Sequence, residues 1–399
     1  MNILYIISKA GPRVRGFTKY IRKQGHRVIL LDTHKCWFPL QSIDSRVSEE
    51  ISGVLKIINP PFLLKNIKTR ALISLANITE FIIDEALSNN IDVIISYNPH
   101  INTALPSLIA SNILRIPWVL DYADLVAIYD TYDYIRSALE IFFCKKAHGV
   151  IVLTKAWKRV LEKCWGIPKY KISVLPNGVD LEIFCINKMR TLNSEIIKSK
   201  LGIDSNDNVV CYTGSISYRK LKRGLVDLQN VRSLIEAIPY VVRKHSNVKF
   251  LLCGFKIDRK LYKLIEYLNL QDFIRITGPY VFGSDEHLGY LKIADVFWMG
   301  ATRSYAMEYF DRFKIYEYMA VGKPVIAPAT ISMREILGDT YPFLVKYEDS
   351  SEIAKCIIQA IEDKSLREEL SKKLRKKIEM KYNWKYLASK LLSFLSKIT

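Results

Sequence analysis

The chain lacks the features of disulfide-linked, zinc-binding and membrane-spanning proteins. Its 399 residues include only seven cysteines, an odd number, and none of them forms a C-x-x-C pair. We therefore expect no disulfide framework, no metal site and the reduced thiols of a cytoplasmic protein. No apolar run reaches about 18 residues, which predicts no transmembrane helix. The first residues, MNILYIISKAG, lack a basic region and a cleavage site, so we expect no signal peptide.

Acidic residues are fewer than basic ones. Asp and Glu number 40 against 59 Lys and Arg, which gives a net charge of +19. Such an excess is typical of proteins that meet nucleic acids, anionic membranes or phosphate-bearing substrates. The sequence has no zinc-finger spacing, RNP-type motif or heptad-linked basic region, so nucleic acid is not the expected partner. A solvated, lysine-rich surface is the alternative explanation of the charge.

The length and the apolar pattern predict two α/β domains. A chain of 399 residues is too long for one ordinary core. A strand at 2–7, a helix at 13–24 and a strand at 26–31 indicate a parallel, doubly wound sheet. The loop before that helix holds the single glycine Gly11, which is not a dinucleotide-binding fingerprint. Further buried strands are expected at 91–96, 117–121, 149–153, 172–175, 209–213, 248–253, 274–277, 294–299 and 325–327.

Residues 308–328, EYFDRFKIYEYMAVGKPVIAP, are predicted to form a loop, a helix, a tight turn and a strand. Asp311 is expected to cap a helix over 312–320. Gly322 fits the left-handed position past the helix end, and 325–327 fits a buried parallel strand. This helix carries the charged residues on which the functional interpretation depends.

One carboxylate in this helix needs a partner. Glu317 lies among apolar residues, and Lys314 precedes it by three positions. A half-buried carboxylate is costly unless it is paired or hydrogen-bonded. Either the two residues form a salt bridge on the helix surface, or Glu317 belongs to a binding site.

The stretch FKIYEYMAVGKPVIA resembles the nucleotide-sugar signature of glycosyltransferase family 4, whose fold is named GT-B. Four other pieces of the chain match this family in the family's order: PNGVD at 176–180, YTGS at 212–215, LIEAI at 234–238 and ADVF at 294–297. The resemblance implies two Rossmann-like, doubly wound domains that face a central cleft. It also implies a C-terminal helix that crosses back to the N-terminal domain.

The same resemblance divides the chain. Residues 1–185 are expected to form the acceptor-binding domain, and residues 186–375 the nucleotide-sugar-binding domain. Residues 376–399 are expected to form a C-terminal helix that packs back on the first domain. The polar stretch 187–208 fits the connection between the two domains.

A basic loop, SISYRKLKRG, follows the first strand of the second domain. A basic loop at a helix N-terminus favours phosphate binding on general grounds. The family places a lysine and an arginine here on the donor diphosphate. Arg223 occupies the lysine position, whereas Ser215 occupies the arginine position, so Arg219 or Lys220 is expected to replace that arginine. A solvated charge cluster is the alternative interpretation of this loop.

The sequence departs from the family at one acidic position. The family pairs its ribose-binding glutamate, here Glu317, with another glutamate eight residues earlier, where this chain has Tyr309. Members with a K-x-x-E-Y-M pattern also lack that residue, and Lys314 is expected to reach the diphosphate. Glu308 or Asp311 is expected to contact the donor sugar instead. The resemblance thus implies donor binding by Gly214, Ser215, Glu308, Asp311 and Glu317, and catalysis by Arg219, Lys220, Arg223 and Lys314.

The acceptor is expected at the first domain. Asp124 and then Asp121 are candidates because DYAD ends a strand, and ligands bind at strand ends in open parallel sheets. Gly11 is a further candidate, with an ordinary strand-to-helix turn as the alternative. His100 is the nearest match to a histidine found in many relatives. Residues 61–87 form either a core helix or a basic amphipathic helix at an anionic membrane.

These features predict a retaining glycosyltransferase. It would move a sugar from a nucleotide-diphosphate sugar to a glycan or lipid-linked acceptor, with no other cofactor. Because the sequence has no D-x-D triplet, we expect arginine and lysine to act in place of a metal ion. The location would be cytoplasmic or peripheral on the inner face of the membrane. The alternatives are a nucleotide-sugar 2-epimerase that uses Asp121 or Asp124, and a non-catalytic basic protein that binds membranes or polyanions.

Overall fold

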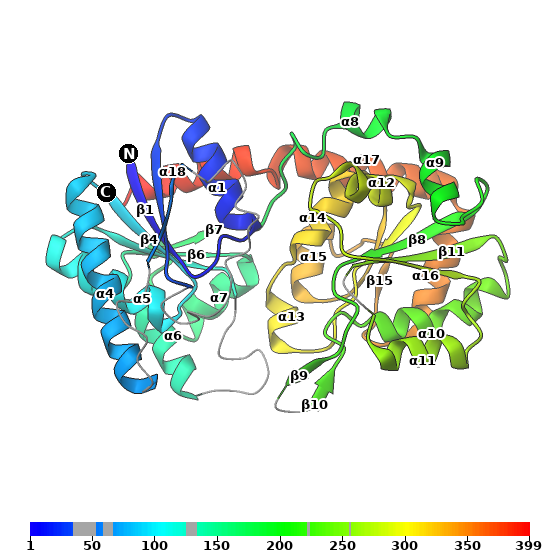
Figure 1. Cartoon of the computed structure of the whole chain (residues 1–399), viewed down its shortest axis with the longest axis horizontal. Coiled ribbons are helices and arrows are strands. Elements are labelled where there is room, and N and C mark those ends of the chain that lie inside the picture. The colour runs from blue at the N-terminus through cyan, green and yellow to red at the C-terminus, as the bar shows by residue number, and fades with distance from the viewer. Residues whose placement is uncertain (35–52, 59–66, 125–133, 222–223, 255–256) are drawn as a thin grey trace. The chain divides into compact units, whose positions relative to one another are not determined.

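The computed structural model describes residues 1–34, 53–58, 67–124, 134–221, 224–254 and 257–399, without the side chains of residues 67–71 and 219–225. Two compact units make up the chain (Figure 1). Unit 1 contains Met1–Gly178 and Trp384–Thr399, and unit 2 contains Val179–Asn383. Each unit carries a parallel sheet flanked by helices. The predicted α/β class with two doubly wound domains is confirmed.

In its described part, unit 1 has a seven-stranded sheet in the order β3-β2-β1-β4-β5-β6-β7, with every neighbouring pair parallel. The strands are almost continuously apolar, as expected of a parallel sheet that is covered on both faces. The strand order reverses between β1 and β4, which creates a topological switch point. The strands are β1 (Asn2–Ile7), β2 (Arg27–Asp32), β3 (Leu55–Ile57), β4 (Val93–Tyr97), β5 (Trp118–Tyr122), β6 (Gly149–Val152) and β7 (Ile172–Val174).

The last helix of the chain belongs to unit 1. The Trp384 ring lies edge-on to Phe17 with the ring centroids 5.2 Å apart. A Cβ on Gly16 would lie 2.3 Å from that ring, so only glycine lets the two helices come this close. The chain therefore returns to unit 1 through α18, which packs on α1. The helices of unit 1 are α1 (Pro12–Lys23), α4 (Ile67–Ser88), α5 (Ile101–Leu114), α6 (Tyr134–Lys146), α7 (Lys155–Lys163) and α18 (Trp384–Leu395), with a 3₁₀ turn at Lys169–Lys171.

Unit 2 repeats the same winding. Its described residues form a six-stranded parallel sheet in the order β12-β11-β8-β13-β14-β15, and the order reverses between β8 and β13. A separate antiparallel hairpin, β9 with β10, follows β8 where the sequence predicted a loop. The strands are β8 (Asn208–Thr213), β9 (Arg219–Leu221), β10 (Gly224–Val226), β11 (Val248–Cys253), β12 (Ile274–Thr277), β13 (Val296–Trp298), β14 (Val325–Pro328) and β15 (Leu344–Val345).

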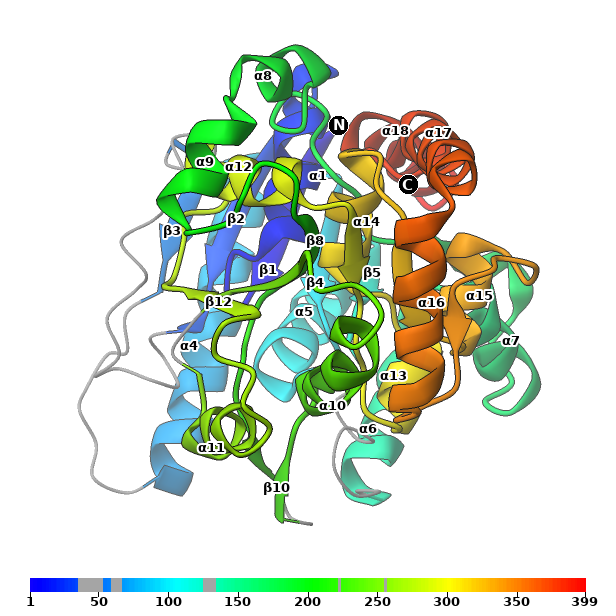
Figure 2. The same ribbon diagram turned by 90° about the vertical axis from the view of Figure 1, so that its right-hand side faces the viewer.

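Helices cover the unit 2 sheet, and Figure 2 shows α16 next to α10, against which it packs. The helix of the signature, α14, begins at Phe313 with Arg312 at its N-cap position. The prediction that Asp311 caps this helix is therefore wrong. The helices are α8 (Ile186–Thr191), α9 (Ser194–Lys200), α10 (Val231–Val242), α11 (Arg259–Tyr267), α12 (Asp285–Ile293), α13 (Tyr305–Tyr309), α14 (Phe313–Ala320), α15 (Ile331–Leu337), α16 (Ser350–Glu362) and α17 (Lys364–Lys381).

Candidate active site

Two glycine turns lie at the carboxyl edge of the unit 2 sheet, beside its switch point. Gly214 follows β8, Gly254 follows β11, and Gly214 N donates to Cys253 O at 2.8 Å. A Cβ on Gly254 would lie 1.8 Å from Gly214 O, so a side chain would collide with the backbone. Gly214 has φ +129°, and a Cβ there would lie 2.6 Å from Lys314 Nζ. Glycine at 254 lets the two turns pack against each other, and glycine at 214 lets the backbone approach the Lys314 ammonium group.

The Lys314 ammonium group is buried and, in the part of the chain that the structure describes, has no carboxylate partner. Nζ donates to Tyr212 Oη and to Gln229 Oε1, both at 3.1 Å, and lies 4.3 Å from the centroid of the Tyr212 ring. Burial and the charge of Arg312 lower the pKa of Lys314 well below its usual value. Among the described residues Lys314 makes no ion pair with Glu317, so the salt bridge left open by the sequence is absent.

A second cation lies beside Lys314. Arg312 donates through Nη1 to Gln229 Oε1, the same oxygen that accepts from Lys314. Arg312 Nη2 is within hydrogen-bonding distance of Leu228 O, at 3.5 Å, and of Met307 Sδ. Two positive groups thus share one neutral amide oxygen. Such a cluster favours an anion that can take charge-assisted hydrogen bonds from both.

The N-terminus of α10 already holds a carboxylate. Asp227 accepts from Gln229 N at 3.2 Å and from Arg232 N at 2.8 Å. Burial raises the pKa of Asp227, while these and neighbouring backbone donors lower it, and the net shift is upward. The first-turn amides of α10, which the sequence suggested as phosphate donors, are therefore engaged by Asp227. In the described residues the cationic side chains beside it are the donors that remain for an anion.

Glu317 lies three residues after Lys314 on α14, and only 12% of its side chain is exposed. No residue of the described part donates a hydrogen bond to its carboxylate. The nearest donor is His287 Nε2, which lies 3.6 Å from Glu317 Oε2. A carboxylate this buried is costly without hydrogen-bond donors. Its unfilled acceptor positions are therefore suited to a ligand that carries hydroxyl groups.

In unit 1, Asp121 is tied into a buried ion pair. Both of its oxygens accept from Arg13, at 2.8 to 3.1 Å, and Tyr5 Oη donates to one of them. Arg13 also donates to three oxygens of residues 175–177. Burial lowers the pKa of Arg13, but the charge of Asp121 raises it, and the net shift is upward. This network joins α1, β5 and the turn after β7.

The other acceptor candidates also lie at strand ends. Asn98, in the left-handed region at φ +61°, accepts from Ala123 N and Asp124 N at 2.9 Å and donates to Asp124 Oδ2 at 3.2 Å. Asp124 is exposed. Gly11 precedes α1 with open space around it. Burial, and then the charge of Arg136, lower the pKa of His100, which precedes α5.

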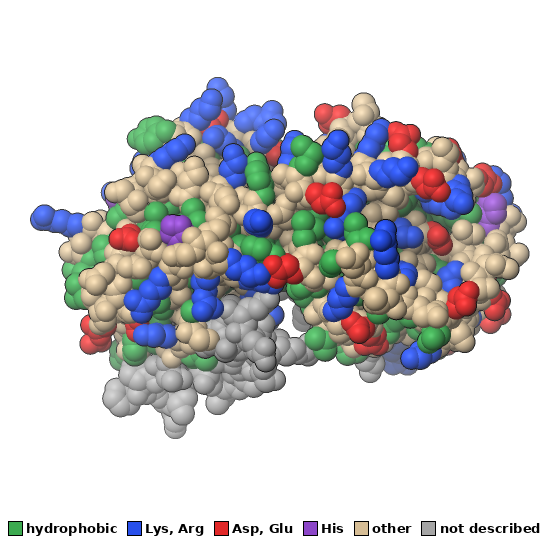
Figure 3. Space-filling view, turned by 90° about the horizontal axis from the view of Figure 1, so that it is seen from above, with side chains coloured by type: hydrophobic (Ala, Val, Ile, Leu, Met, Phe, Trp, Pro, Cys, Tyr) green, Lys and Arg blue, Asp and Glu red, His purple; other side chains and the backbone are tan. Residues whose placement is uncertain are grey.

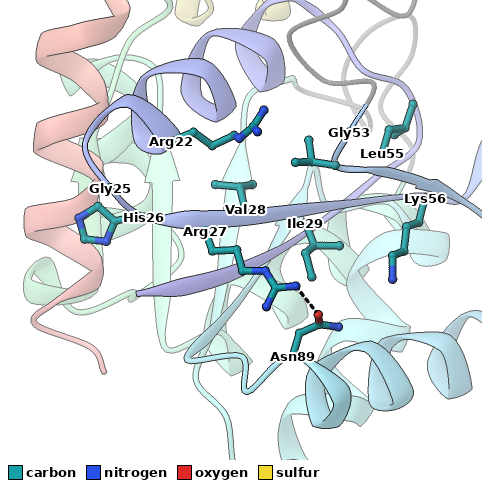
Figure 4. A pocket seen from close by; sticks show the side chains of 11 residues that line it. Arg22, Gly25, His26, Arg27, Val28, Ile29, Gly53, Leu55, Lys56 and Asn89 are labelled. Carbon is teal, nitrogen blue, oxygen red and sulfur yellow. Dashed lines mark hydrogen bonds between the residues drawn. The ribbon is translucent and has the colours of Figure 1, made fainter.

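A separate pocket of about 660 Å³ lies at the amino-terminal edge of the unit 1 sheet (Figure 4). Its basic residues are Arg22, Arg27 and Lys56, and Arg27 donates to Asn89 Oδ1 at 2.7 Å. The pocket lies at the amino ends of β2 and β3. Ligands of open parallel sheets bind at the carboxyl ends, so this pocket lies away from the expected acceptor region.

Models of known families match nearly the whole chain. The model described as Glycosyltransferase Family 4 matches residues 10–183, and the model described as Glycosyl transferases group 1 matches residues 193–377. The chain belongs to glycosyltransferase family 4. This family 4 chain is 25% identical over 197 residues to alpha-monoglucosyldiacylglycerol synthase of Streptococcus pneumoniae, a match that covers 48% of the chain and 40% of that protein. The match thus spans less than half of that relative's length.

Solved structures share the fold over the full chain. A glycosyltransferase from Rickettsia africae ESF-5 has a TM-score of 0.76 and 18% identity, with 100% of this chain and 98% of that chain covered. Anabaena Alr3699/HepE, solved in complex with UDP, has a TM-score of 0.74 and 18% identity, with both chains covered completely. The chain therefore has the GT-B fold, as the signature predicted.

The family 4 signature brings some of the predicted donor residues together. Gly214 lies against Lys314 at the carboxyl edge of the unit 2 sheet, and Glu317 follows Lys314 by three residues on α14. Glu308 accepts instead from Ile331 N at 3.2 Å and from Tyr347 Oη at 3.0 Å, which links α13 to α15.

The five other predicted residues lie in the signature, at Asp311, and in the basic loop after β8. Asp311 is buried and accepts from Tyr316 Oη. Ser215 is exposed, with its Oγ 2.8 Å from Ser217 Oγ. Arg219 and Lys220 lie in β9, but their side chains, and the whole of Arg223, lie outside the described residues.

Sequence reasoning missed Arg312, Gln229 and His287. The only signal for Arg312 was its basic side chain two residues before Lys314. Gln229 and His287 are distant from α14 in sequence and belong to no motif of the family. Nor does the described part of the chain contain a group of three or more His, Cys, Asp or Glu side chains placed to hold a metal ion.

Proposed function

We propose that this family 4 protein is a retaining glycosyltransferase whose donor is a nucleoside diphosphate sugar. The observation that carries the proposal is that α14 presents the Lys314 cation and the Glu317 carboxylate one turn apart, and that neither has an oppositely charged partner at hydrogen-bonding distance among the described residues. A nucleoside diphosphate offers an anionic diphosphate and, one sugar ring away, two ribose hydroxyl donors. Lys314 and Glu317 would bind these two parts.

The spacing of the two charges supports this pose. Residues three apart on a helix have Cβ atoms about 5–6 Å from each other. Lys314 extends toward Gly214 and Gln229, whereas Glu317 extends toward His287. The cationic and the anionic end of the site are therefore side by side but separate, as the diphosphate and the ribose hydroxyls of one ligand require.

The proposed chemistry uses the cations on the leaving group. The bond between the anomeric carbon and the diphosphate oxygen breaks, and the electron pair stays on the departing nucleoside diphosphate. Lys314 and Arg312 would stabilise that charge, together with the sequence-predicted residues Arg219, Lys220 and Arg223. The acceptor hydroxyl attacks from the face that the diphosphate leaves, and its proton passes to the leaving phosphate oxygen. The product then keeps the anomeric configuration of the donor.

The acceptor is proposed to be a glycan or a lipid-linked molecule, and unit 1 favours the lipid. Helix α5 has no charged residue over its 14 positions, and it packs against α4 and α6. The three helices expose large apolar side chains, and α6 ends in Lys145 and Lys146. An apolar face with basic residues beside it suits the surface of an anionic membrane. The exposed residues are Leu72, Ile73, Phe81, Leu87, Ile101, Ile109, Ile113, Tyr134, Ile135 and Phe142.

Two further features bear on the location. Among the described residues, no helix combines the length and the apolarity needed to cross a bilayer. On the face shown in Figure 3, Lys and Arg side chains are spread over the surface with Asp and Glu between them. We propose that the protein lies peripherally on the inner face of the membrane. The apolar helices of unit 1, rather than general surface charge, would contact the bilayer.

Product analysis tests the proposed function. The protein is incubated with UDP, GDP and ADP sugars, with and without diacylglycerol vesicles or oligosaccharides, and the products are examined by NMR. The expected result is an acceptor-dependent glycoside with the donor's anomeric configuration. An inverted product would contradict the retaining mechanism. A 2-epimer formed without acceptor would establish the epimerase instead, and nucleotide binding without any product would favour a non-catalytic protein.

A further inference from the structure

We propose that His287 is a positioning residue that orients the Glu317 carboxylate for the donor ribose, an inference that rests on the proposed function. His287 lies in the first turn of α12, and its side chain is completely buried. Its ring stacks on Tyr280 at 4.5 Å between centroids with 3° between the planes. Phe282 and Phe184 lie beside the same ring. The imidazole is therefore held in one orientation by aromatic packing.

The hydrogen bonding of the ring determines where its proton lies. Gly283 N donates to His287 Nδ1 at 3.1 Å, so Nδ1 carries the lone pair. In a neutral imidazole the proton is then on Nε2, which makes Nε2 a donor. Among the described residues this buried Nε2 has no hydrogen-bond partner. Buried donors are nearly always paired in native proteins, so an unpaired one calls for an explanation.

The unpaired donor faces the unpaired acceptor. His287 Nε2 lies 3.6 Å from Glu317 Oε2, slightly beyond hydrogen-bonding distance. A shift of a few tenths of an ångström would complete a charge-assisted bond between them. Oε2 would then be fixed by His287, and Oε1 would accept from the ribose hydroxyls. Because Nδ1 accepts from Gly283 N, the ring would donate to the carboxylate through Nε2 alone.

The Gly283 turn sets this geometry. Gly283 has φ +76°, which favours glycine, and its amide fixes the tautomer of the histidine four residues later. Ser284 caps α12 by accepting from His287 N at 3.2 Å, so the backbone of the histidine is anchored as well. The ring cannot turn Nε2 away from Glu317 without losing the bond to Gly283 and the stacking on Tyr280.

Calorimetric titration with UDP and with 2′,3′-dideoxy-UDP tests the inference in wild type, His287→Leu, His287→Gln and Glu317→Ala. His287→Leu should weaken UDP binding about tenfold, the effect of one hydrogen bond to a charged group. It should change dideoxy-UDP binding little, because that ligand lacks the ribose hydroxyls. The amide of His287→Gln should restore most of the affinity, and His287→Leu should add no loss to Glu317→Ala.

Contrary results separate a failure of the His287 inference from a failure of the donor site. Equal weakening of UDP and dideoxy-UDP, or losses that add to those of Glu317→Ala, would reduce His287 to a structural role. If wild type binds no nucleotide, or Glu317→Ala binds as well as wild type, the proposed donor site itself fails. Nitrogen-15 NMR of the histidines needs no variant of His287. It should show the Nε2–H tautomer, and an Nδ1–H tautomer would overturn the inference.

Discussion

The carboxyl edges of the two sheets treat charge in opposite ways. In unit 1, each carboxylate oxygen of Asp121 accepts two hydrogen bonds, which come from Arg13 and Tyr5, and the ion pair of Asp121 with Arg13 is buried. In unit 2, Lys314 and Glu317 lie on one helix turn, and neither meets an opposite charge at hydrogen-bonding distance within the described residues. Both sheets have the same winding and a switch point.

In both units the strand topology places charged side chains at the carboxyl edge of the sheet. The hydrogen-bond partners of each charged side chain then distinguish a structural role from ligand binding. A buried ion pair that is complete within the protein fixes the structure, and breaking it leaves an uncompensated charge. A buried charge left without a partner is a cost that only a ligand offsets. We therefore propose that the edge of unit 1 at Asp121 is structural and that the edge of unit 2 at Lys314 is a binding site.

The largest effect is expected on stability at the unit 1 edge. Asp121→Asn leaves Arg13 buried without its anion, which should lower the free energy of unfolding by about 3–5 kcal/mol. Urea unfolding of the variant and of Glu317→Gln measures the contrast, because Glu317→Gln should change stability by less than about 1 kcal/mol. If Asp121→Asn is as stable as wild type but no longer transfers sugar to the acceptor, Asp121 binds the acceptor instead.

At the unit 2 edge the effect is expected on turnover instead. Lys314→Met removes a cation from the departing diphosphate, which should lower kcat about 10²–10³-fold. Stability should stay the same or rise, since a buried ammonium group is replaced by an apolar chain of similar length. Lys373→Met, at an exposed lysine that pairs with Glu369, is the matched control. If Lys314→Met is destabilised as much as Asp121→Asn, Lys314 has a structural role and the proposed difference between the two edges is wrong.

The unpaired lysine should also make nucleotide binding depend on pH. Burial, followed by the charge of Arg312, lowers the pKa of Lys314, so the ammonium group loses its proton at a pH below the usual range. A bound diphosphate favours the charged form and raises that pKa in the complex. Affinity for UDP should therefore fall, by up to about tenfold per pH unit, as pH rises between these two pKa values.

Calorimetric titrations with UDP from about pH 7 to pH 10 measure this dependence, and Lys314→Met is the control. Affinity in the variant should vary much less over the same range. An affinity that is constant in wild type would mean that Lys314 does not bind the diphosphate.

The smallest effect is expected at Glu308. Both oxygens of its carboxylate accept from protein donors, Tyr347 Oη and Ile331 N, so it resembles Asp121 rather than Glu317. Glu308→Gln should cost about 1 kcal/mol of stability, the worth of an ordinary hydrogen bond, and leave UDP affinity unchanged. Thermal unfolding and calorimetry measure both quantities. A raised KM for the nucleotide sugar with normal UDP binding would instead place Glu308 against the donor sugar.

The sequence predicted the fold well because its signals are local. Apolar runs of four to six residues mark the parallel strands, and the turn at Gly322 separates α14 from β14. The signature also nominated Lys314 and Glu317 as site residues, since both lie on one helix. The error at Asp311 was a boundary error: the helix starts at Phe313, one residue later than predicted, and the Asp311 carboxylate accepts from Tyr316 Oη.

The partners of these residues could not be read from the sequence. Gln229 reaches Lys314 across 85 positions, and Asp121 reaches Arg13 across 108. His287 meets Glu317 only because α12 and α14 fold to the same edge of the sheet. Whether a buried charge is satisfied depends on such long-range contacts. The sequence therefore nominated Asp121 and Glu317 alike, and only the fold separates them.

Calorimetric titration of wild type and Glu317→Ala with UDP, GDP and ADP tests the central claim most directly. One nucleoside diphosphate should bind to wild type, and the variant should lose most of that affinity while it unfolds at the wild-type temperature. No binding of any nucleotide to the folded wild type would contradict the claim. Lys314 and Glu317 would then not form a nucleoside diphosphate site.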